Sequence, residues 1–337
     1  MISRSHYRRF WKELKASDNF LITTHINPDG DGLCSMLIMA KVLRSFRKRY
    51  FIVMEDLFPQ RYRFLFSHFS QCVIPEYIQV PPDSDLKDVL PESFNPETLL
   101  VIDTHSIFRL GQFAQDIPGL ELKKVFTIDH HKGKSRLPHT LELSDSGVSS
   151  TSEIIYSLLK TGGFRINRCI AELLYIAIAT DTKSFSQSNT TSSTHRIASD
   201  LLRTGIKPEE ISYYFQEMPA VTMKVFGRVI SRLKLELRGQ AVWSYITKKE
   251  LGQCANADVD GLIEMIRNVK GTKIALLFKE VDENKIKVCL RGKRDFNVFR
   301  IAKVFDGGGH LQASGFLIGK KMKESIRIVL KKIQSYL

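Results

Sequence analysis

The sequence predicts a two-domain α/β protein, with a mostly parallel sheet in the N-terminal domain and a smaller, mixed α/β C-terminal domain. Three observations support this fold class. The chain has 337 residues, more than a single hydrophobic core usually serves. Near-continuous apolar runs, such as Thr98-Leu-Leu-Val-Ile-Asp103, are typical of strands buried on both faces of a parallel sheet. After residue 222, shorter strand patterns alternate with helical ones, which indicates a second, smaller sheet.

The first half of the chain reads as alternating helices and strands. The predicted elements, in order, are a helix at 7–15, a strand at 20–25, a helix at 33–46, and strands at 49–54, 98–103 and 124–129. Residues 75–96 are rich in Pro, Asp and Ser and predict a long surface connection. The apolar segment 173–181 fits either a strand or a buried helix.

Composition favours a globular protein of the cytoplasm. Hydrophobic residues make up 43% of the chain and charged residues 26%. No apolar leader occurs in the first fifteen residues and no run reaches eighteen apolar residues, so we expect neither export nor a membrane span. The five cysteines are scattered and lack C-x-x-C pairing, which argues against a disulfide framework or a zinc finger. The net charge of +14 can attract polyanions, although surface lysines and arginines are also ordinary solvating groups.

The turn after the first predicted strand, His25-Ile-Asn-Pro-Asp-Gly-Asp31, is the most informative stretch. Its proline and glycines give the backbone freedom to aim Asp29 and Asp31 at one point. One imidazole and two carboxylates at the carboxyl end of a strand indicate a divalent-metal site, because an acidic turn would repel an anion. A solvated Asp-Gly turn is the plainer interpretation unless further ligands come from elsewhere in the chain.

Further candidate ligands do occur at the ends of later apolar segments. They are Asp103, the triplet Asp129-His130-His131, and Asp181. Carboxyl ends of parallel strands lie along one edge of a sheet, so these groups can converge. Without cations, so many carboxylates would repel one another and their pKa values would rise. Two divalent metal ions would remove this conflict.

The ordered set of motifs resembles the DHH phosphoesterase superfamily. The N-terminal motifs are residues 25–31, Asp103 with Arg109-Leu-Gly111, the triplet 129–131 and Asp181-Thr182, joined by 149–153 and 188–191. The stretches 307–310 and 313–315 resemble the DHH-associated domain found in the same superfamily. The subgroup that the chain most resembles comprises two-domain oligoribonucleases (nanoRNases) with pAp phosphatase activity and stand-alone cyclic di-AMP and pApA phosphodiesterases.

The resemblance implies two metal ions, and manganese suits ligands of this kind. One ion would be held by His25, Asp29 and Asp103, and the second by Asp31, Asp103, His130 and Asp181, so that Asp103 bridges both. Two ions about 3.5–4 Å apart can ionise a bridging water for in-line attack at phosphorus. Mg²⁺, Co²⁺ and Zn²⁺ stay open, because the types of ligand alone do not exclude them.

Other residues of the N-terminal motifs are expected to assist the reaction. Asp129 is expected to orient an imidazole rather than to bind metal. His131 is a candidate to contact the phosphate or to protonate the leaving oxygen, with support of a neighbouring ligand as the alternative. Arg109 is expected to bind substrate. The chain departs from the superfamily pattern at Cys34, where a glycine is frequent, and in the apolar segment 105–108.

Residues 191–222 predict a helical connector between an N-terminal domain at 1–190 and a C-terminal domain at 223–337. The C-terminal domain has strand patterns at 241–246, 273–278 and 285–290 and an amphipathic closing helix at 320–337. Successive glycines let backbone N–H groups approach a phosphate, although a flexible turn is the plainer explanation of the glycines taken alone. The resemblance implies that the nucleotide and its terminal phosphate are bound by Arg291, Gly307, Gly308, Gly309 and His310. Lys293 and Arg294 fit solvated surface charge.

The resemblance therefore implies a metal-dependent phosphohydrolase with its active site in the cleft between the two domains. The expected substrates are short 5′-phosphorylated oligoribonucleotides, the dinucleotide pApA, and nucleoside 3′,5′-bisphosphates such as pAp. Hydrolysis of cyclic di-AMP is the main alternative, and a non-catalytic nucleotide-binding regulator is a second. A membrane is not an expected partner. The oligomeric state is left open, with a homodimer as one arrangement.

Overall fold

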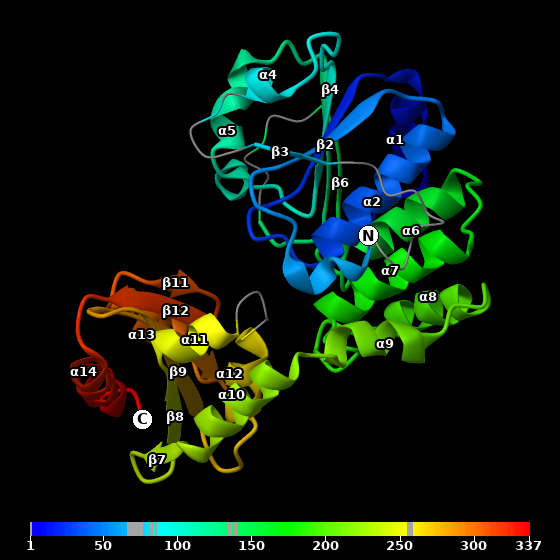
Figure 1. Ribbon diagram of the computed structural model, residues 1–337. Helices are drawn as coiled ribbons and strands as arrows, with labels where there is room; N and C mark the ends of the chain where they lie inside the picture. Colours follow the sequence, from blue (N-terminus) through cyan, green and yellow to red (C-terminus); the bar gives the residue numbers. More distant parts are fainter. Residues whose placement is uncertain are drawn as a thin grey trace. The chain divides into compact units, whose positions relative to one another are not determined.

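The computed structural model describes residues 2–65, 77–80, 84, 86–133, 137, 140–254 and 259–337. The chain divides into two compact units, Met1–Phe215 and Gln216–Leu337, and each is described by itself (Figure 1). The division lies within the stretch 191–222 that the sequence predicts as a connector. The domain limits at residues 190 and 223 stay a prediction.

A parallel sheet forms the centre of the N-terminal unit. Its described strands are β1 (Phe20–Thr23), β2 (Tyr50–Met54), β3 (Tyr77–Gln79), β4 (Thr98–Ile102), β5 (Lys124–Asp129) and β6 (Leu141–Ser144), in the order β3-β2-β1-β4-β5-β6. Every neighbouring pair in this order is parallel. The chain builds outward from β1 in one direction and then from β4 in the other. Open α/β sheets bind ligands at the carboxyl ends of strands beside such a switch point.

Helices cover both faces of this sheet. One core includes side chains of α1 (Arg4–Ala16), α2 (Gly30–Ser45), α6 (Thr151–Thr161), α7 (Arg168–Asp181) and α8 (Ser192–Leu202), and the other those of α4 (Leu86–Val89) and α5 (Phe113–Asp116). Short 3-10 turns occur at η1 (Gln60–Tyr62), η3 (Ile107–Leu110) and η4 (Ile117–Gly119). Along β4, Leu100 and Ile102 join the first core and Leu99 and Val101 the second. This two-sided burial explains the near-continuous apolar run of β4.

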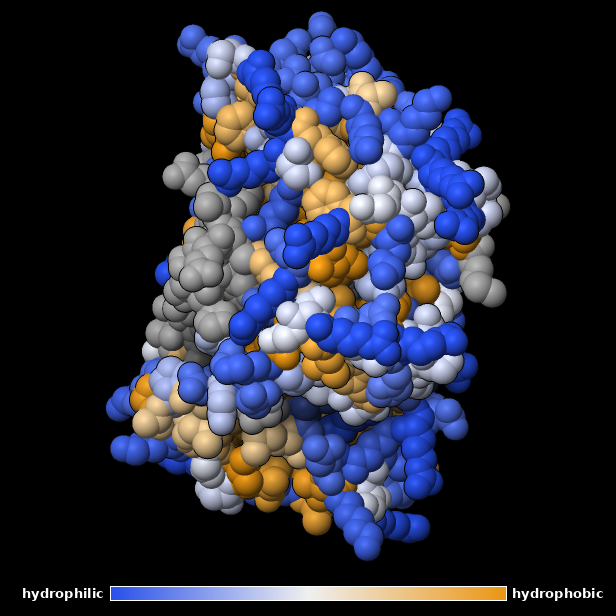
Figure 2. All heavy atoms as spheres, turned by 90° about the vertical axis from the view of Figure 1, so that its right-hand side faces the viewer, coloured by the Kyte–Doolittle hydropathy of each residue, from blue (hydrophilic) through white to orange (hydrophobic). Residues whose placement is uncertain are grey.

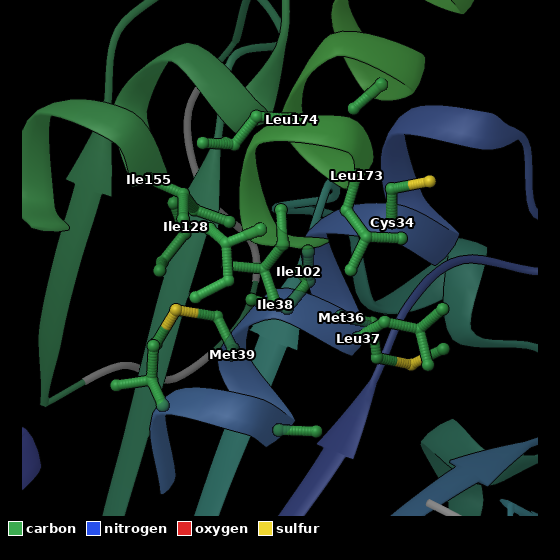
Figure 3. Close-up of a cluster of buried hydrophobic side chains, with 14 of the residues drawn as sticks. Cys34, Met36, Leu37, Ile38, Met39, Ile102, Ile128, Ile155, Leu173 and Leu174 are labelled. Carbon is green, nitrogen blue, oxygen red and sulfur yellow. The ribbon is translucent and has the colours of Figure 1, made fainter. Parts of the chain in front are cut away.

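Helix α2 is central to the first core. Figure 3 shows Ile38 of α2 gathered with Ile102 of β4, Ile128 of β5 and Leu173 of α7, and all four side chains are fully buried. The segment 173–181, which the sequence left open between strand and helix, is the second half of α7. Close packing of this kind fixes the position of α2. It therefore also fixes the acidic turn at the start of that helix.

Two described strands of the sheet were not predicted from the sequence. β3 lies inside the stretch 75–96, so the prediction of a surface connection was wrong for residues 77–79. Residues 75, 76, 81–83 and 85 of that stretch lie outside the described residues. β6 is the second unpredicted strand. Both are edge strands of three or four residues, which are too short for alternation of polar and apolar residues to be distinctive.

The C-terminal unit is built on a mixed sheet with the order β11-β12-β10-β9-β8-β7. Its strands are β7 (Lys234–Glu236), β8 (Ala241–Ile246), β9 (Ile274–Asp282), β10 (Lys285–Gly292), β11 (Gly308–Gly309) and β12 (Ala313–Ile318). The pair β8–β9 is parallel and the other described neighbours are antiparallel. One core includes α10 (Ala220–Ser231), α11 (Lys248–Gln253) and α12 (Asp260–Arg267), and the other α13 (Phe299–Lys303) and α14 (Met322–Gln334). The predicted two-domain α/β fold class is confirmed.

The face drawn in Figure 2 is mostly hydrophilic, with hydrophobic side chains showing between charged ones. Large exposed hydrophobic side chains are frequent along α9 (Pro208–Gln216) and α10, where Tyr213 and Met223 are more than half exposed. In the part of the chain that the structure describes, no helix is long and apolar enough to cross a membrane.

The described cysteines differ in state. Cys34 and Cys254 are free and buried and Cys289 is buried, whereas Cys169 is disulfide-bonded, which the scattered spacing did not predict. Cys34 is fully enclosed in the core of α2, and burial raises the pKa of its thiol well above the usual value. A protonated thiol in such surroundings acts as a small hydrophobic side chain. Cys34 thus fills space behind the acidic turn.

Candidate functional site

His25 follows β1 and is the first of the expected metal ligands. Its Nδ1 lies 2.8 Å from the carbonyl oxygen of Ile26. Burial of the ring, together with the positive charge of Arg109, lowers the pKa of His25 and favours the neutral imidazole. Because a carbonyl only accepts, Nδ1 carries the proton and Nε2 keeps its lone pair. Within the described residues, Nε2 has no hydrogen-bond partner, and it lies 3.4 Å from Oδ2 of Asp103.

The acidic turn begins α2, and Asp29 is the N-cap of that helix. Its Oδ1 accepts hydrogen bonds from the backbone N–H groups of Asp31, at 3.0 Å, and Gly32, at 3.1 Å. An Asp at this position satisfies donors that a helix start otherwise leaves unpaired. The cap fixes Asp29 beside His25 and Asp103.

The two glycines of the turn allow close packing. A Cβ atom at Gly30 would lie 2.5 Å from Cγ2 of Thr180, and one at Gly32 would lie 2.6 Å from Oγ1 of Thr24 and 3.3 Å from Oδ2 of Asp103. Neither glycine has a positive φ angle. The expectation that they provide backbone freedom was therefore wrong. Their missing side chains let α2 lie directly against the candidate ligands.

Asp31 is fully buried and is held by the first turn of α6. Its Oδ2 accepts from the backbone N–H of Thr151 at 2.6 Å, and its Oδ1 accepts from the N–H of Ser152 at 3.1 Å and from Ser35 Oγ at 3.2 Å. A helix N-terminus is a favourable place for a negative charge. Even so, burial and then the nearby carboxylate of Asp181 raise the pKa of Asp31 to about 8. Asp31 is therefore placed where loss of contact with water opposes its ionised form.

Asp103 stands just beyond β4 in a left-handed backbone conformation, with a φ angle of 62°. Its backbone N–H donates to the carbonyl of Ile128 at 2.8 Å, and its Oδ1 accepts from Thr151 Oγ1 at 2.7 Å. Burial and then the nearby Asp31 carboxylate raise the pKa of Asp103 well above the usual value. A left-handed conformation at a non-glycine residue costs of order 1 kcal/mol and is concentrated at functional sites. The fold holds Asp103 in place at an energetic cost.

The expected ligands converge at the carboxyl edge of the parallel sheet. Groups whose ligand atoms all lie within 4.8 Å of one another are His25, Asp29 and Asp103; Asp31, His130 and Asp181; and Asp103, His130 and His131. Nε2 of His130 lies 3.0 Å from Oδ2 of Asp181 and 3.5 Å from Oδ1 of Asp103. Burial lowers the pKa of His130, but Asp181 and Asp31 outweigh it and raise the value to about 9. Their assignment as ligands stays a prediction.

The chemistry of this edge fits divalent cations. The lone pair of His25 Nε2 is buried and has no hydrogen-bond partner among the described residues, and its ring is fixed through Nδ1 as in metal-binding histidines. Two buried carboxylates have raised pKa values because nothing with positive charge outweighs their burial and repulsion. Oxygen ligands combined with imidazole suit Mn²⁺ and related ions.

A second set of polar side chains lies beside the candidate ligands. Asp129 is fully buried and contacts two imidazoles, His131 Nδ1 at 2.7 Å and His105 Nδ1 at a shorter distance. Burial opposes its ionisation, but the hydrogen bonds from His131 and His105 lower the pKa of Asp129 to about 2. Nε2 of His131 lies 3.3 Å from Nη1 of Arg109. Because arginine only donates, this Nε2 is the acceptor, and His131 carries its proton on Nδ1.

Three residues that hold the candidate ligands and Asp129 in place were not predicted from the sequence. His105 was noted only as part of an apolar departure, yet its ring contacts Asp129. Thr151 and Ser35 donate to Asp103 and Asp31. The spacing of Ser150 and Glu153 is a helix-start signal that could have placed backbone N–H groups at residues 151 and 152. Nothing in the local sequence indicates that this helix points at Asp31.

In the C-terminal unit, two of the three motif glycines are explained by packing. Gly308 and Gly309 form β11, paired with β12. A Cβ at Gly307 would lie 2.4 Å from the carbonyl oxygen of Gly315, and one at Gly309, whose φ angle is 130°, would lie 2.4 Å from that of Ala313. A Cβ at Gly308 would meet no described atom within 4 Å. Of the three, Gly308 is the one whose lack of a side chain leaves open space for a ligand.

The other predicted substrate-binding residues of this unit differ in how far they are engaged. His310 is exposed, and its backbone N–H donates to Ala313 at 2.7 Å. Arg291 donates from Nε to Oε1 of Glu264 at 2.7 Å, and Glu264 also pairs with Arg267. Arg291 is therefore held in an ion pair, which limits the charge that it can offer a ligand. These assignments stay predictions.

Comparison with known proteins identifies both units. Residues 19–178 match the N-terminal domain of the DHH family, and residues 244–337 match the DHHA1 domain. The chain is 25% identical to the bifunctional oligoribonuclease and PAP phosphatase NrnA of Thermus thermophilus, over 98% of this chain and 96% of that protein. It is 28% identical to the protein of the same name from Bacillus subtilis, over 88% of each.

A solved structure extends the likeness to the fold. An exopolyphosphatase-related protein from Bacteroides fragilis superposes with a TM-score of 0.84 at 23% identity, over 100% of this chain and 97% of that one. The resemblance read from the motifs is confirmed by the two domain matches, which together span most of the chain. The chain belongs to the DHH phosphoesterase superfamily and is a hydrolase that acts on phosphoester bonds.

Proposed function

We propose that the chain is a divalent-metal-dependent phosphodiesterase and phosphatase of short nucleotides. Its proposed substrates are 5′-phosphorylated oligoribonucleotides, including pApA, and nucleoside 3′,5′-bisphosphates such as pAp. One observation carries the proposal: three overlapping sets of metal-competent side chains converge beside the switch point of the sheet. The names of the relatives from Thermus and Bacillus support the choice of substrate. We propose two manganese ions, with Asp103 shared between them.

Divalent ions bound at these side chains would activate water and neutralise charge on the phosphate. The chain's own groups would position the reaction. Arg109 can donate to an oxygen of the scissile phosphate, and His131, which accepts from Arg109, fixes the guanidinium. Asp129 holds His131 in the tautomer that makes this possible. In this arrangement the neutral ring has no proton on Nε2, so His131 orients Arg109 rather than protonating the leaving group.

The C-terminal unit would bind the nucleotide. In this proposal, Gly308 leaves room for a phosphate beside the backbone of β11, and His310 adds a donor from an exposed position. Arg291 would contact the nucleotide with the guanidinium nitrogens that Glu264 does not use. This division assigns chemistry to the first unit and substrate affinity to the second.

The test is a product-resolved assay of the purified chain with Mn²⁺. pApA, pAp, a short 5′-phosphorylated RNA and cyclic di-AMP are supplied separately, and products are separated by chromatography. We expect mononucleotides from pApA and RNA, and AMP with phosphate from pAp. Turnover confined to cyclic di-AMP would replace the proposed substrate class. Tight nucleotide binding without turnover of any substrate would make the chain a regulator instead.

A further inference from the structure

A cationic pocket lies at the amino ends of the strands in the N-terminal unit, at the edge of the sheet opposite the candidate metal ligands. Its volume is about 380 Å³, within the range of roughly 300–1,000 Å³ that small-molecule sites occupy. Of the described residues that line it, three are cations and none is acidic. The lining residues are Arg44, Lys48, Arg49, Tyr50, Phe51, Pro91, Ser93 and Phe94.

The topology of the sheet separates this pocket from the candidate metal site. Tyr50 begins β2, whereas His25 and Asp103 follow the carboxyl ends of the parallel strands β1 and β4. Arg44 lies in the last turn of α2, and Asp29 caps the first turn of the same helix. The 16 residues of α2 span roughly 24 Å, at about 1.5 Å per residue. A mononucleotide is too short to contact both ends of this helix, so the pocket is not part of the proposed catalytic site.

Hydrogen bonds and ring contacts hold the wall of the pocket. Nη2 of Arg49 donates to the carbonyl of Ser93 at 2.7 Å, and the guanidinium carbon lies 5.5 Å from the ring centroid of Phe94. Phe94 is buried and packs edge to face against Phe51, with ring centroids 4.7 Å apart. These contacts join the start of β2 to the segment 91–94. The pocket therefore has a fixed wall.

The positive charge of the pocket is not neutralised within the part of the chain that the structure describes. None of Arg44, Lys48 and Arg49 forms an ion pair with a carboxylate of a described residue. Oδ1 of the nearby Asp18 accepts from the backbone N–H of Arg49 at 2.9 Å. Burial and then the positive charge of Arg44 lower the pKa of Lys41 on the same helix. Like charges placed close together repel one another, and an anion between them relieves the repulsion.

The position of two cations at the end of a helix has a plainer explanation. Positive side chains there interact favourably with the helix dipole, which accounts in part for Arg44 and Lys48. Arg49 lies beyond the end of α2, however, and its side chain reaches the carbonyl of Ser93. The dipole therefore does not explain why a third cation closes the pocket from another segment of the chain.

We propose that this pocket binds a chain of two or more phosphates, as in a nucleoside diphosphate or triphosphate, at a site separate from the catalytic one. Guanidinium groups bind phosphate oxygens through paired hydrogen bonds, and an ammonium group adds a point charge. A single phosphate group carries a charge of about −1.5 to −2 at pH 7, so three cations match two or more phosphates. The half-buried rings of Tyr50 and Phe51 add an apolar side for a nucleoside. The inference does not rest on the proposed function.

The test measures binding to the full chain by calorimetry, with a chelator present to prevent metal-dependent turnover. The ligands are ADP and inorganic pyrophosphate, with adenosine as the ligand that lacks phosphate. Arg44→Gln with Lys48→Gln removes two charges from the pocket. Arg8→Gln with Arg196→Gln removes two exposed charges from α1 and α8 and serves as the control.

We expect the Kd values of ADP and pyrophosphate to rise on the order of tenfold in the pocket variant only, since each lost charge removes a strong hydrogen bond to phosphate. Any binding of adenosine should be the same in all three proteins. Tighter binding of ADP than of pyrophosphate at the pocket would identify a nucleotide as the source of the phosphates. Equal binding would identify the inorganic anion.

Chemical footprinting of wild type locates the ligand without any substitution. Lysines are reductively methylated and quantified by mass spectrometry, with the exposed Lys12 of α1 as the reference. Saturating pyrophosphate should slow methylation of Lys48 and leave that of Lys12 unchanged. No binding of either phosphate ligand, equal Kd values in the pocket and control variants, or unchanged reactivity of Lys48 at saturation would each overturn the proposed site.

Discussion

Two buried carboxylates at the candidate metal site, Asp31 and Asp103, contrast with the buried carboxylate of Glu250 in the C-terminal unit. In the N-terminal unit, burial raises the pKa values of Asp31 and Asp103, so their ionised forms are unfavourable in the folded protein. In the C-terminal unit, hydrogen bonds from Arg232 lower the pKa of Glu250 to about 2, so its ionised form stabilises the fold. The difference indicates that Asp31 and Asp103 are placed at the cost of their own ionisation, as acids that await a cation would be, whereas Glu250 is ionised and holds α10 and α11 together.

The Asp103→Asn variant tests whether Asp103 serves a cation rather than the stability of the fold. It should have the largest effect. In the proposed two-ion site, loss of the carboxylate shared by both cations removes several kcal/mol of transition-state stabilisation, which corresponds to about a thousandfold in kcat. Asn tolerates the left-handed backbone, and a buried charge is removed, so we expect the metal-free melting temperature to stay equal or rise. Both are measured by steady-state kinetics and by thermal unfolding with a chelator.

The same thermal unfolding is also measured with Mn²⁺ in place of the chelator. Wild type should melt at a higher temperature with Mn²⁺ than with chelator, because an ion that binds only the folded state stabilises it. The Asp103→Asn variant should lose most of this shift. Near-wild-type turnover would remove Asp103 from the centre, and a large fall in metal-free stability would give it a structural role.

His105 contacts Asp129, the buried acid of the N-terminal unit whose pKa is lowered rather than raised. A variant of His105 therefore tests the ionised acid of that unit. His105→Ala removes one of the two imidazoles that hold Asp129, and kcat/KM should fall by about 10–100-fold, as for other residues that orient metal-site groups. His105→Asn keeps an N–H donor at a similar place and should recover much of the loss. His195, exposed on α8, provides the control variant His195→Ala. Equal activity of His105→Ala and the control would exclude a positioning role.

The proposed nucleotide-binding residues of the C-terminal unit should show a smaller effect, confined to affinity. Arg291→Ala and Gly308→Ala should each raise KM for pApA by up to about tenfold with little change in kcat. Gly319→Ala is the matched control, since a Cβ there also meets no described atom within 4 Å. A fall in kcat with unchanged KM would contradict the assignment of affinity to this unit.

Glu250→Gln tests the stabilising acid and should have the smallest effect, about 1 kcal/mol at most. The pKa of Glu250 in the folded unit, about 2, lies below its ordinary value of 4.5. Its contribution is therefore complete above pH 4.5 and is lost as the pH falls toward 2. Unfolding is followed by Trp243 fluorescence in a Trp11→Phe background, with Glu236→Gln as a control for an exposed acid. A wild-type pH profile in Glu250→Gln would exclude this carboxylate as the cause.

Much of the fold could be predicted because the signals are local. The strand at 241–246 was predicted with the bounds that β8 has, and the runs at 98–103 and 124–129 end where β4 and β5 end, within one residue. Strands buried on both faces need continuous apolar residues, and that pattern can be recognised in the sequence without knowing which strands lie beside them. β3 and β6 were not predicted, because a short edge strand forms through pairing with a neighbouring strand and its own sequence carries little signal.

The sequence by itself determined which side chains could form the site. Acids and imidazoles at the ends of apolar segments in one ordered set of motifs were enough to name His25, Asp103 and Asp181, together with the superfamily. Only the tertiary structure decided how these groups are held. Thr151 donates to Asp31 from 120 positions away in the chain, and His105 meets Asp129 on a different strand end. Such contacts depend on how helices and strands pack, and packing is non-local, so no short stretch of sequence carries it.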